Sequence, residues 1–523
     1  MRRPISLAIR IGGPATVFLW AVTILTPNAG AQLGAAAGGS QGTPATQLPL
    51  SGRNAQGGSV TSTQAPVPGT TTSVNTLNPS VQVQGPFAGS TRSTDKLPFS
   101  GRLSLIEAIE RGTEFNLGAV GLTQAVQQSR GQTRAARSAL LPNIGANLSG
   151  TMQQLNLAAS GLRFEAPIPG FSVPSVVGPF NYFDLRASLS HTVMDMTAWN
   201  NYRAAGENER ATEFSADDAR DLVVFAVGGA YLQVIAAKAK VEAARVQLET
   251  ANALYQQTQQ QRSAGVVAQT DLNRSRIQAL TQQQRLISLQ NDLAKQKINL
   301  ARLTGLSPND AYETIDEIPF APLPPVVLDD ALKQAFEQRS DLKAAEAQVR
   351  AAERALAAAR AERLPSFSMR ADYGVIGTNP AQSHGTFALV GTIHIPIWQG
   401  NRIKADIEQA TAPLIQRRAE LEDLRGRIEA EVRNAYLDLQ ATTSQVGVAM
   451  KNIEAARENL DLTRQRFDAG VGDNVEVVQS QESVATAQLD YINSVFAHNV
   501  AKLSLARAIG RAAENFRRFL NVQ

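Results

Sequence analysis

Four segments of this chain alternate between apolar and polar side chains with a period of two, and they occur as two pairs. The first pair covers residues 143–153 and 183–193, and the second covers residues 366–375 and 386–397. Each segment is about 11 residues long, the length that a tilted strand needs to cross a bilayer. The alternation leaves two interpretations open: membrane strands with lipid on one face and water on the other, or a soluble sheet with one buried face.

A long helical hairpin follows each pair of strands. Residues 201–262 contain no proline and little glycine, which predicts a helix about 90 Å long, and residues 270–303 form its partner. Residues 402–468 and 474–509 repeat this arrangement, and Pro413 is expected to bend the first of these two helices near its start. Heptads along the second helix of each hairpin are typical of coiled coils with a left-handed supercoil. The heptad positions are Leu272, Ala279, Leu286, Leu293 and Leu300, with counterparts Val477, Val484, Tyr491, His498 and Leu505.

The strands and helices together predict an oligomer. Helices of this length cannot form one compact core, so they must pack side by side into a bundle or a tube. Four strands cannot close a barrel, and an open sheet edge is not tolerated in lipid. Closure therefore requires further copies of the chain: two copies would supply eight strands and three copies would supply twelve.

The chain also contains an internal duplication, in which each copy has the order helix, strand, strand, long helix, long helix. Three matches lie 205 positions apart and one upstream match lies 223 positions apart, so an insertion of 18 residues separates the copies. The insertion falls in the Pro/Gly-rich stretch 158–179, and it is either a long loop at the cell surface or a disordered spacer. The matching segments are Ala264-Gly265-Val266 with Ala469-Gly470-Val471, Leu300-Ala301-Arg302 with Leu505-Ala506-Arg507, Ala230-Tyr231-Leu232 with Ala435-Tyr436-Leu437, and Leu141-Pro142 with Leu364-Pro365.

The N-terminus has the pattern of a cleavable secretory signal. Three arginines precede a short apolar run, residues 15–25, and Ala29-Gly30-Ala31 supplies a small-residue cleavage site. A transmembrane anchor is the alternative, but about a dozen apolar residues cannot cross roughly 30 Å of hydrocarbon as a helix. We therefore expect the mature chain to begin after residue 31.

The segment that follows is rich in Gly, Ser, Thr, Gln and Pro, so we expect it to be a disordered leader or one draped over the surface. Folded structure is expected to begin near Leu103, where Ser104 can cap a helix with Glu107 three residues later. The predicted divisions are a signal peptide (1–31), a low-complexity leader (32–102), a first repeat (103–321), a second repeat (322–511) and a C-terminal tail (512–523).

The composition excludes several classes of chemistry. The chain has no cysteine, which excludes disulfides, zinc–thiolate sites, a cysteine nucleophile and a lipidated N-terminal cysteine. Removal of residues 1–31 lowers the formal net charge from +4 to +1, so nothing indicates a nucleic-acid partner. The four histidines are not spaced as metal ligands, and no phosphate-binding loop or hydrolase motif occurs. We therefore expect no cofactor, no metal ion and no catalysis.

A signal peptide, duplicated strand pairs and paired long helices joined by Ala-Gly-Val turns resemble the TolC family of outer-membrane efflux proteins (outer membrane factors). The resemblance runs from about Leu103 to Arg511, and its most specific elements are the turns at residues 264–271 and 469–476. It implies a homotrimer with a 12-stranded β-barrel in the outer membrane and a 12-helix α-barrel that extends into the periplasm. It also implies passive export of substrates delivered by an inner-membrane pump, of the RND or ABC type, through a periplasmic adaptor protein.

The resemblance places adaptor docking and closure of the duct at the two helix turns. The docking candidates are Gly265, Val266, Val267, Gly470, Val471 and Gly472, and the gate candidates are Thr270, Asp271, Glu476 and Gln479. In well-known members an arginine just after the second-turn glycine holds the aspartate that Asp271 matches, but Gly472 occupies that position here. The two turn glycines also fit ordinary left-handed helix caps, which require no further function.

Glu476 falls where the family has an acidic gate residue, and Gln479 replaces a second acid one turn later. Three copies of Glu476 around a threefold axis would form an acidic ring that attracts cations and opposes closure. The alternative is a solvated acid that complements the N-terminal dipole of its helix.

The leading function is thus an exit duct for efflux or type I secretion. An adhesive or structural trimeric coiled coil with a β-barrel anchor is the alternative, although such proteins usually carry one barrel segment at one chain end.

Overall fold

The structure is a computed structural model that describes residues 58–67, 76–92, 99–157, 159, 174–317, 319–324, 326–510 and 512–520. The predicted signal peptide and most of the 158–179 insertion lie outside these residues. Two copies of one unit make up the described chain. Helix α2 (Leu117–Ser138), strands β4 and β5, and helices α3 (Met196–Ser263) and α4 (Gln269–Thr304) form the first copy. Helix α6 (Ser340–Ala361), strands β7 and β8, and helices α7 (Arg402–Asp468) and α8 (Asn474–Ala508) form the second.

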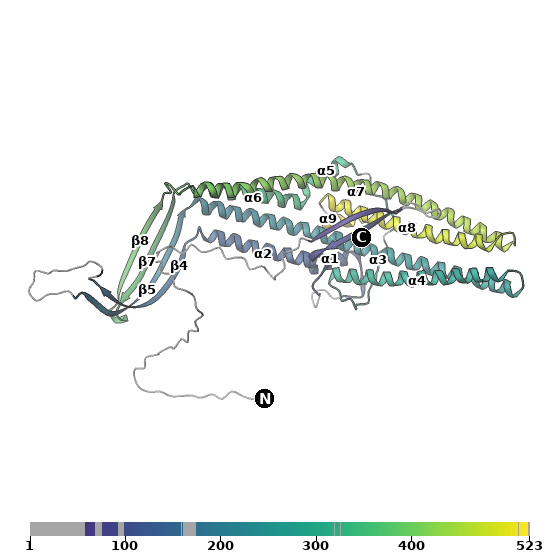
Figure 1. The fold of residues 1–523 in the computed structure, drawn as a ribbon, viewed down its shortest axis with the longest axis horizontal. Coiled ribbons are helices and arrows are strands. Elements are labelled where there is room, and N and C mark those ends of the chain that lie inside the picture. Colours follow the sequence, from purple (N-terminus) through teal and green to yellow (C-terminus); the bar gives the residue numbers. More distant parts are fainter. Residues whose placement is uncertain are drawn as a thin grey trace, which may run out of the picture. The chain divides into compact units, whose positions relative to one another are not determined.

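The four predicted strands form one antiparallel sheet in the order β4-β5-β7-β8 (Figure 1). The strands are β4 (Asn143–Asn156), β5 (Val176–Met194), β7 (Ser366–Gly377) and β8 (His384–His394), with the short helix η2 (Pro380–Gln382) between the last two. Residues 176–179 of the insertion thus extend β5. One face of the sheet is apolar and bare: Ile144, Leu148, Met152 and Phe387 are between 72% and 81% exposed. A soluble sheet would cover such a face, so the membrane interpretation is the one that fits.

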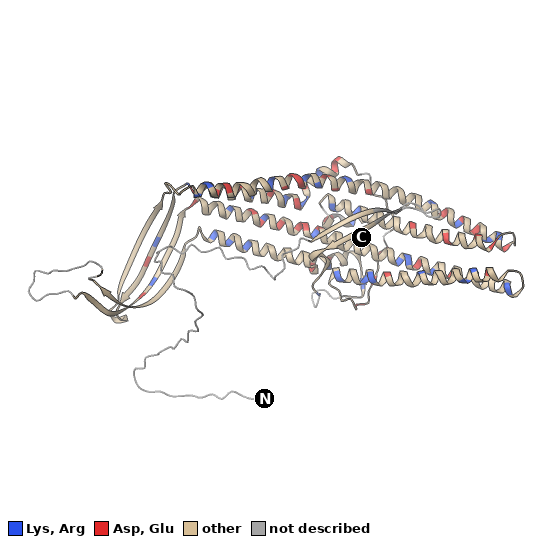
Figure 2. Ribbon diagram, viewed as in Figure 1, with Lys and Arg blue, Asp and Glu red and all other residues tan. Residues whose placement is uncertain are grey.

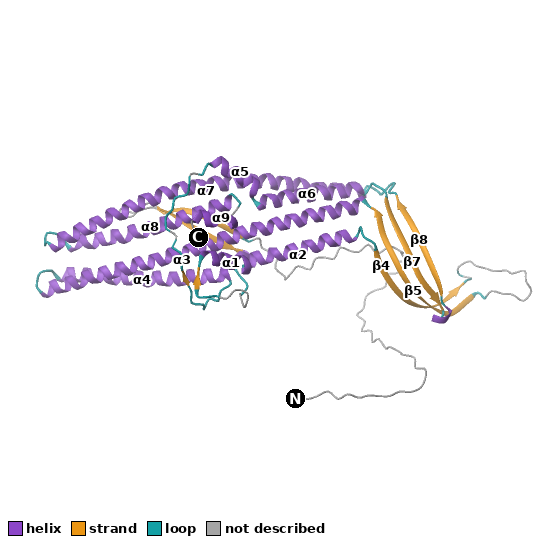
Figure 3. Cartoon of the chain, turned by 180° about the vertical axis from the view of Figure 1, so that it is seen from behind, coloured by secondary structure: helices purple, strands orange, loops and turns teal. Residues whose placement is uncertain are grey.

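The four long helices lie where the sequence predicted them, within a few residues at each end. Pro413 lies inside α7, and the helix continues through it. We call α3 and α4 hairpin 1, and α7 and α8 hairpin 2. The predicted heptad positions pack along these hairpins: Ala279 and Leu300 of α4 and Val477, Val484, His498 and Leu505 of α8 are buried. Figures 1 and 3 show the hairpins extending away from the sheet and ending in two turns at the far end.

Helix α3 is apolar on all sides near its middle, and other segments of the chain cover it on two opposite sides. This helix is the one described segment apolar enough to cross a membrane by composition, but 67% of that window is buried within the chain. One cover is made of α1 (Leu105–Phe115), strand β3 (Arg102–Leu103), strand β6 (Glu313–Thr314), which pairs in parallel with β3, and residues 315–317 and 319–321. We call these segments the belt. Because it is buried by its neighbours, α3 is a core helix.

Of the two alternatives for the leader, residues 59–67 and 76–84 fit the one packed on a surface and not the disordered one. Strands β1 (Ser59–Val67) and β2 (Thr76–Gln84) pair antiparallel as a two-stranded hairpin, here called the leader hairpin. Its apolar residues pack on the helices, since Val60 is 8% exposed and Val81 would contact any side chain at Gly229 of α3. The alternation of valine with polar residues supplies one apolar face, enough to fold against an existing surface. The expected cap was correct: Ser104 accepts a hydrogen bond from the backbone of Glu107.

The predicted C-terminal tail is also folded, since residues 512–520 form helix α9 (Ala512–Leu520). Its Ala512, Phe516 and Leu520 join the apolar core around α3, and the Ala513 backbone donates to Asp221 of α3 at 2.8 Å. The remaining helices are η1 (Gly85–Ala88), which follows the leader hairpin, and α5 (Leu328–Gln338), which packs on α7. Both chain ends that the structure describes are therefore anchored on the helical hairpins.

His498 of α8 is a buried packing residue, as its heptad position predicts. Its ring packs at a tilt against Phe320 of the belt, with 4.9 Å between centroids, and its Nε2 lies 3.3 Å from the carbonyl oxygen of Ala321. The Lys502 ammonium binds the same oxygen. Burial and the charge of Lys502 lower the pKa of His498 to about 4. The imidazole is therefore neutral at pH 7.

This pKa makes a prediction for stability at acid pH. Because the folded-state pKa lies below the ordinary value of 6.5, the unfolded chain binds more protons, and stability is lost as pH falls from about 6.5 towards 4. We expect a loss of about 2 kcal/mol over that window. His498→Asn should abolish this part of the pH dependence. Melting temperatures of the two proteins at pH 7 and pH 4.5 measure it, and parallel curves would contradict the assignment.

Candidate functional site

The turns that end the two hairpins have matching backbone geometry. Gly265 and Gly470 adopt left-handed conformations, with φ of 77° and 74°. Val266 donates its backbone N–H to Gln261, and Val471 donates to Arg466, which satisfies carbonyl groups at the ends of α3 and α7. Both valine side chains are 73% exposed. Each turn therefore presents a bare apolar residue at its outermost point.

The candidate gate residues of hairpin 1 lie in the first turn of α4. Thr270 is exposed, and Asp271 forms an ion pair with Arg274 on the same helix at 3.0 Å. The backbone oxygen of Asp271 accepts a hydrogen bond from Asn474 Nδ2 of hairpin 2 at 3.2 Å. The structure thus joins the two turns through the backbone of Asp271, and its carboxylate stays within its own helix.

The candidates of hairpin 2 lie at the start of α8. Glu476 is in the first turn, where its charge complements the helix dipole, and its carboxylate lies 3.4 Å from Arg466 of α7. Gln479 is exposed one turn later. The helix itself is capped by Asp473, which accepts from the backbone of Val475 at 3.1 Å. Glu476 is therefore not needed as a cap, and its carboxylate remains half exposed.

Gly472 has a steric reason to be glycine. A Cβ at this position would lie 2.9 Å from the backbone nitrogen of Phe467 and 3.0 Å from the carbonyl carbon of Arg466. Its N–H donates to the Arg466 oxygen at 3.0 Å, so the turn closes tightly on the end of α7. An arginine cannot occupy this position without opening the turn. The contact from Asn474 to Asp271 joins the hairpins instead.

Sequence reasoning missed the side chains that join α4 to α8 above the turns. Glu482 of α8 accepts hydrogen bonds from Gln282 at 3.2 Å and from Arg285 at 3.0 Å, both on α4. Gln257 of α3 donates to Asp468 of α7 at 3.0 Å. Polar residues that flank a heptad seam often pair between helices, and this signal could have identified Arg285 and Glu482.

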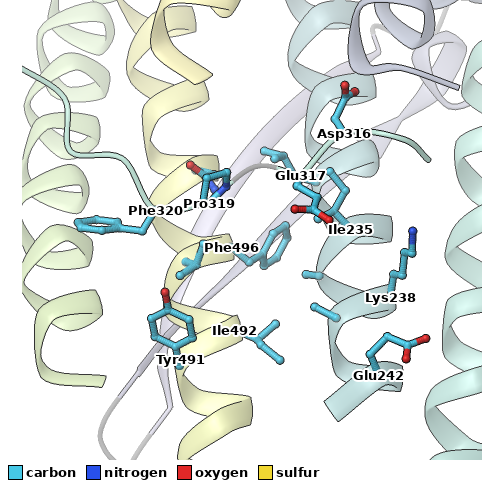
Figure 4. Close-up of a pocket in the computed structure, with 15 residues that line it drawn as sticks. Ile235, Lys238, Glu242, Asp316, Glu317, Pro319, Phe320, Tyr491, Ile492 and Phe496 are labelled. Carbon is cyan, nitrogen blue, oxygen red and sulfur yellow. The ribbon is translucent and has the colours of Figure 1, made fainter. Parts of the chain in front are cut away.

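An apolar cavity of about 430 Å³ lies where the two copies of the duplication meet (Figure 4). Apolar side chains of α3 and α8 line most of it, including Ile235, Ile492 and Phe496. Residues 316, 317, 319 and 320 of the belt complete it. Lys238, Glu242, Asp316 and Glu317 supply its charged lining. Helices α3 and α8 thus pack less tightly against each other on the side that faces the belt.

The face of the sheet opposite the apolar one carries its charges, which Figure 2 shows near the middle of the strands. Arg186 of β5 pairs with Asp184 at 3.1 Å and with Asp372 of β7 at 2.6 Å. Arg370 lies on the same face of β7, two residues from Asp372. Polar residues on this face suit a water-filled interior once the sheet is closed. Among the residues that the structure describes, no cluster of His, Asp and Glu could hold a metal ion.

A bare apolar band on one sheet face, a charged opposite face and helices far longer than a bilayer is thick define a protomer of an envelope-spanning channel. The model of the outer membrane efflux protein family matches residues 122–306 and 331–511. The chain belongs to this family, and the resemblance inferred from its turns and strand pairs is confirmed.

Individual relatives are distant but similar over most of their length. The chain is 24% identical to the pyoverdine export outer membrane protein OpmQ of Pseudomonas putida, over 78% of this chain and 85% of OpmQ. It is 22% identical to the outer membrane protein TolC of Escherichia coli, over 72% of this chain and 76% of TolC. The solved outer membrane channel CmeC of Campylobacter jejuni matches with a TM-score of 0.67 at 16% identity, over 83% of this chain and 98% of CmeC.

Family membership sets the assembly. Proteins of this family are homotrimers in the outer membrane that extend into the periplasm, where they work with adaptor proteins and inner-membrane pumps. Three copies of the sheet supply the twelve strands of a closed barrel, which removes the open edges of β4 and β8. The chain is therefore an outer-membrane efflux channel protomer.

Proposed function

We propose that substrates cross this channel passively and that the turns of the two hairpins control the passage, with Glu476 lining the narrowest point. The observation that carries the proposal is how the hairpins are joined near their ends. Asn474, Glu482 and Asp468 each form a side-chain contact with hairpin 1, at 3.0–3.2 Å. Contacts of this kind are worth roughly 1 kcal/mol each, so they can hold a closed state without making it permanent.

The pump supplies the energy in this proposal, and the channel performs no catalysis. The chain has no cysteine, its sequence has no hydrolase or nucleotide-binding motif, and its relatives are named as outer membrane and export proteins. We expect the delivered substrate to be set by the pump, of the RND or ABC type.

The adaptor docks, in this proposal, on the outermost points of the two hairpins. Val266 and Val471 are the exposed anchors, and Val267 lies half-buried beside the first. Exposed apolar residues on a rigid turn bury area on binding at little entropic cost. Gly265, Gly470 and Gly472 contribute by fixing the shape of the turns.

Glu476→Gln tests the gate assignment. Three carboxylates at a narrow point attract cations, so their removal should reduce cation selectivity about twofold or more and weaken block by divalent cations. Current recordings of the purified trimer in planar bilayers measure both. Glu454→Gln, also on hairpin 2 but on α7 and away from the turn, is the matched control. Unchanged selectivity and unchanged block would remove Glu476 from the gate.

Membership of the efflux family excludes the adhesive or structural scaffold that the sequence left open, and the same recordings check this directly. A scaffold would give no ion current, whereas the channel should conduct once its turns open. The charged inner face formed by Arg186, Asp184 and Asp372 favours the channel, because a scaffold has no use for charges in a barrel interior.

A further inference from the structure

The belt and the leader hairpin lie on opposite sides of α3. Tyr231 faces the belt: its hydroxyl lies 2.9 Å from the Leu103 oxygen and 2.8 Å from Asp316 Oδ2. Gly229 faces the leader hairpin, because a Cβ there would meet Val81 at 2.9 Å. Residues two positions apart on a helix are rotated by about 200°, so Gly229 and Tyr231 point in nearly opposite directions.

Two further contacts on α3 confirm this arrangement. Gly228 faces α8, since a Cβ there would meet Leu503 at 2.7 Å. Val227 faces the belt, where it approaches Gly112 of α1. Residue 227 thus points to the belt, residue 228 to the neighbouring helix α8, and residue 229 to the leader hairpin. Figure 4 agrees, with Asp316 and Glu317 in front of α3 and the purple leader strands behind the helices.

The chain crosses from one side to the other at residues 85–92. This segment runs between the start of α2 and the end of α4: Asn116 Nδ2 donates to the Phe87 oxygen at 2.8 Å, and Ser90 Oγ donates to the Arg302 oxygen at 2.5 Å. The backbone of Leu117 donates to Gly89 at 2.9 Å. The crossing is therefore fastened to both helices.

In a closed tube of helices, the two sides of the wall are the outer surface and the bore. Twelve helices spaced about 9–10 Å apart enclose a bore of about 26 Å. Three copies of the belt, each with a helix about 10 Å thick plus strands and a linker, would fill that space. Three thin two-stranded hairpins would leave an opening of about 10 Å. The belt therefore lies outside.

We propose that the leader hairpin lies inside the bore, where three copies form a polar, uncharged collar that narrows the channel between the barrel and the turns. Its surface facing away from α3 has the chemistry of a bore lining. Among the hairpin residues whose side chains the structure describes, the exposed ones are Ser59, Thr61, Thr63, Ser80, Gln82 and Gln84, all polar and none charged. The collar limits the size of what passes and discriminates little by charge. This inference rests on the trimeric channel.

The absence of native cysteine makes the test clean. Ser80→Cys places one thiol on the exposed face of the leader hairpin, and Ser100→Cys places one on an exposed residue beside β3 of the belt. Both are nearly isosteric changes. The cationic reagent MTSET should lower the current through the Ser80→Cys trimer at least twofold and leave the Ser100→Cys trimer unchanged. A maleimide on 5 kDa polyethylene glycol should label Cys at position 100 only, whereas a small maleimide should label both.

Each other outcome overturns the collar. Polyethylene glycol labelling at position 80, or a current change only at position 100, places the hairpin outside. No labelling at position 80 even by the small maleimide shows that its polar face is covered. If the trimer carries no current even when its turns are open, the channel function fails, and the two labelling reactions still locate the hairpin.

Discussion

Glu482→Ala should open the channel and raise its conductance in planar bilayers several-fold. Glu482 is the shared acceptor of Gln282 and Arg285, so one change removes both of these contacts between α4 and α8. The side chains of Arg285 and Glu482 are 32% and 41% exposed, which screens their ion pair to about 1 kcal/mol. If the three protomers move together, the loss is about 3 kcal/mol, or roughly a hundredfold in the ratio of closed to open states.

Glu429→Ala is the matched control for this experiment. Glu429 is also a glutamate in an ion pair, but its partner Arg433 lies on the same helix, at 2.7 Å. Its removal should leave the conductance unchanged. Gln282→Ala should have an intermediate effect, since the Arg285 contact remains. Equal conductance of Glu482→Ala and the natural protein would show that these contacts do not hold the closed state.

Arg339→Met should destabilise the protein by about 3 kcal/mol, the largest stability effect expected from one substitution outside the apolar core. Arg339 is 2% exposed and pairs with Asp341 and Glu431, each at 2.6 Å. Burial alone would raise the pKa of Asp341, but the guanidinium outweighs it and holds that pKa below its usual value. Without Arg339, a largely buried carboxylate loses its partner.

Thermal melting of the trimer measures the loss of stability, with one variant as a control and a second as a partial rescue. Arg433→Met removes an exposed arginine that is 53% accessible and should change stability by less than about 0.5 kcal/mol. Arg339→Met combined with Asp341→Asn should recover part of the loss, because the unpaired charge is gone. An Arg339→Met protein as stable as the Arg433→Met control would show that the pair contributes nothing.

Much of the fold could be predicted because it depends on local periodicity. The period of two in residues 183–193 and the heptads from Leu272 to Leu300 constrain which faces are buried, whatever the rest of the chain does. The turns at Gly265 and Gly470 could be predicted for the same reason, since a left-handed cap is a property of a few residues.

The candidate site was only partly predictable. Glu476, Asp271 and the turn valines were identified from motif position, but Glu482 and Asn474 act through contacts with a helix about 200 residues away in the chain. Whether a polar residue on a long helix meets a partner or solvent depends on how the two hairpins are aligned. No local pattern specifies that alignment.

By itself the sequence determined the duplicated strand-and-hairpin unit, the apolar and polar faces of its strands and, for strands in a membrane, the need for several chains. Only the tertiary structure decided which of two equivalent residues, one from each copy of the duplication, is buried. Tyr231 is fully buried under the belt, whereas its counterpart Tyr436 is only half-buried and Leu437 beside it is 59% exposed. The leader hairpin likewise folds only because α3 and α8 offer a surface to pack on, since two strands of polar composition cannot bury enough surface alone. Burial is a property of what covers a residue, and the covering segments come from elsewhere in the chain.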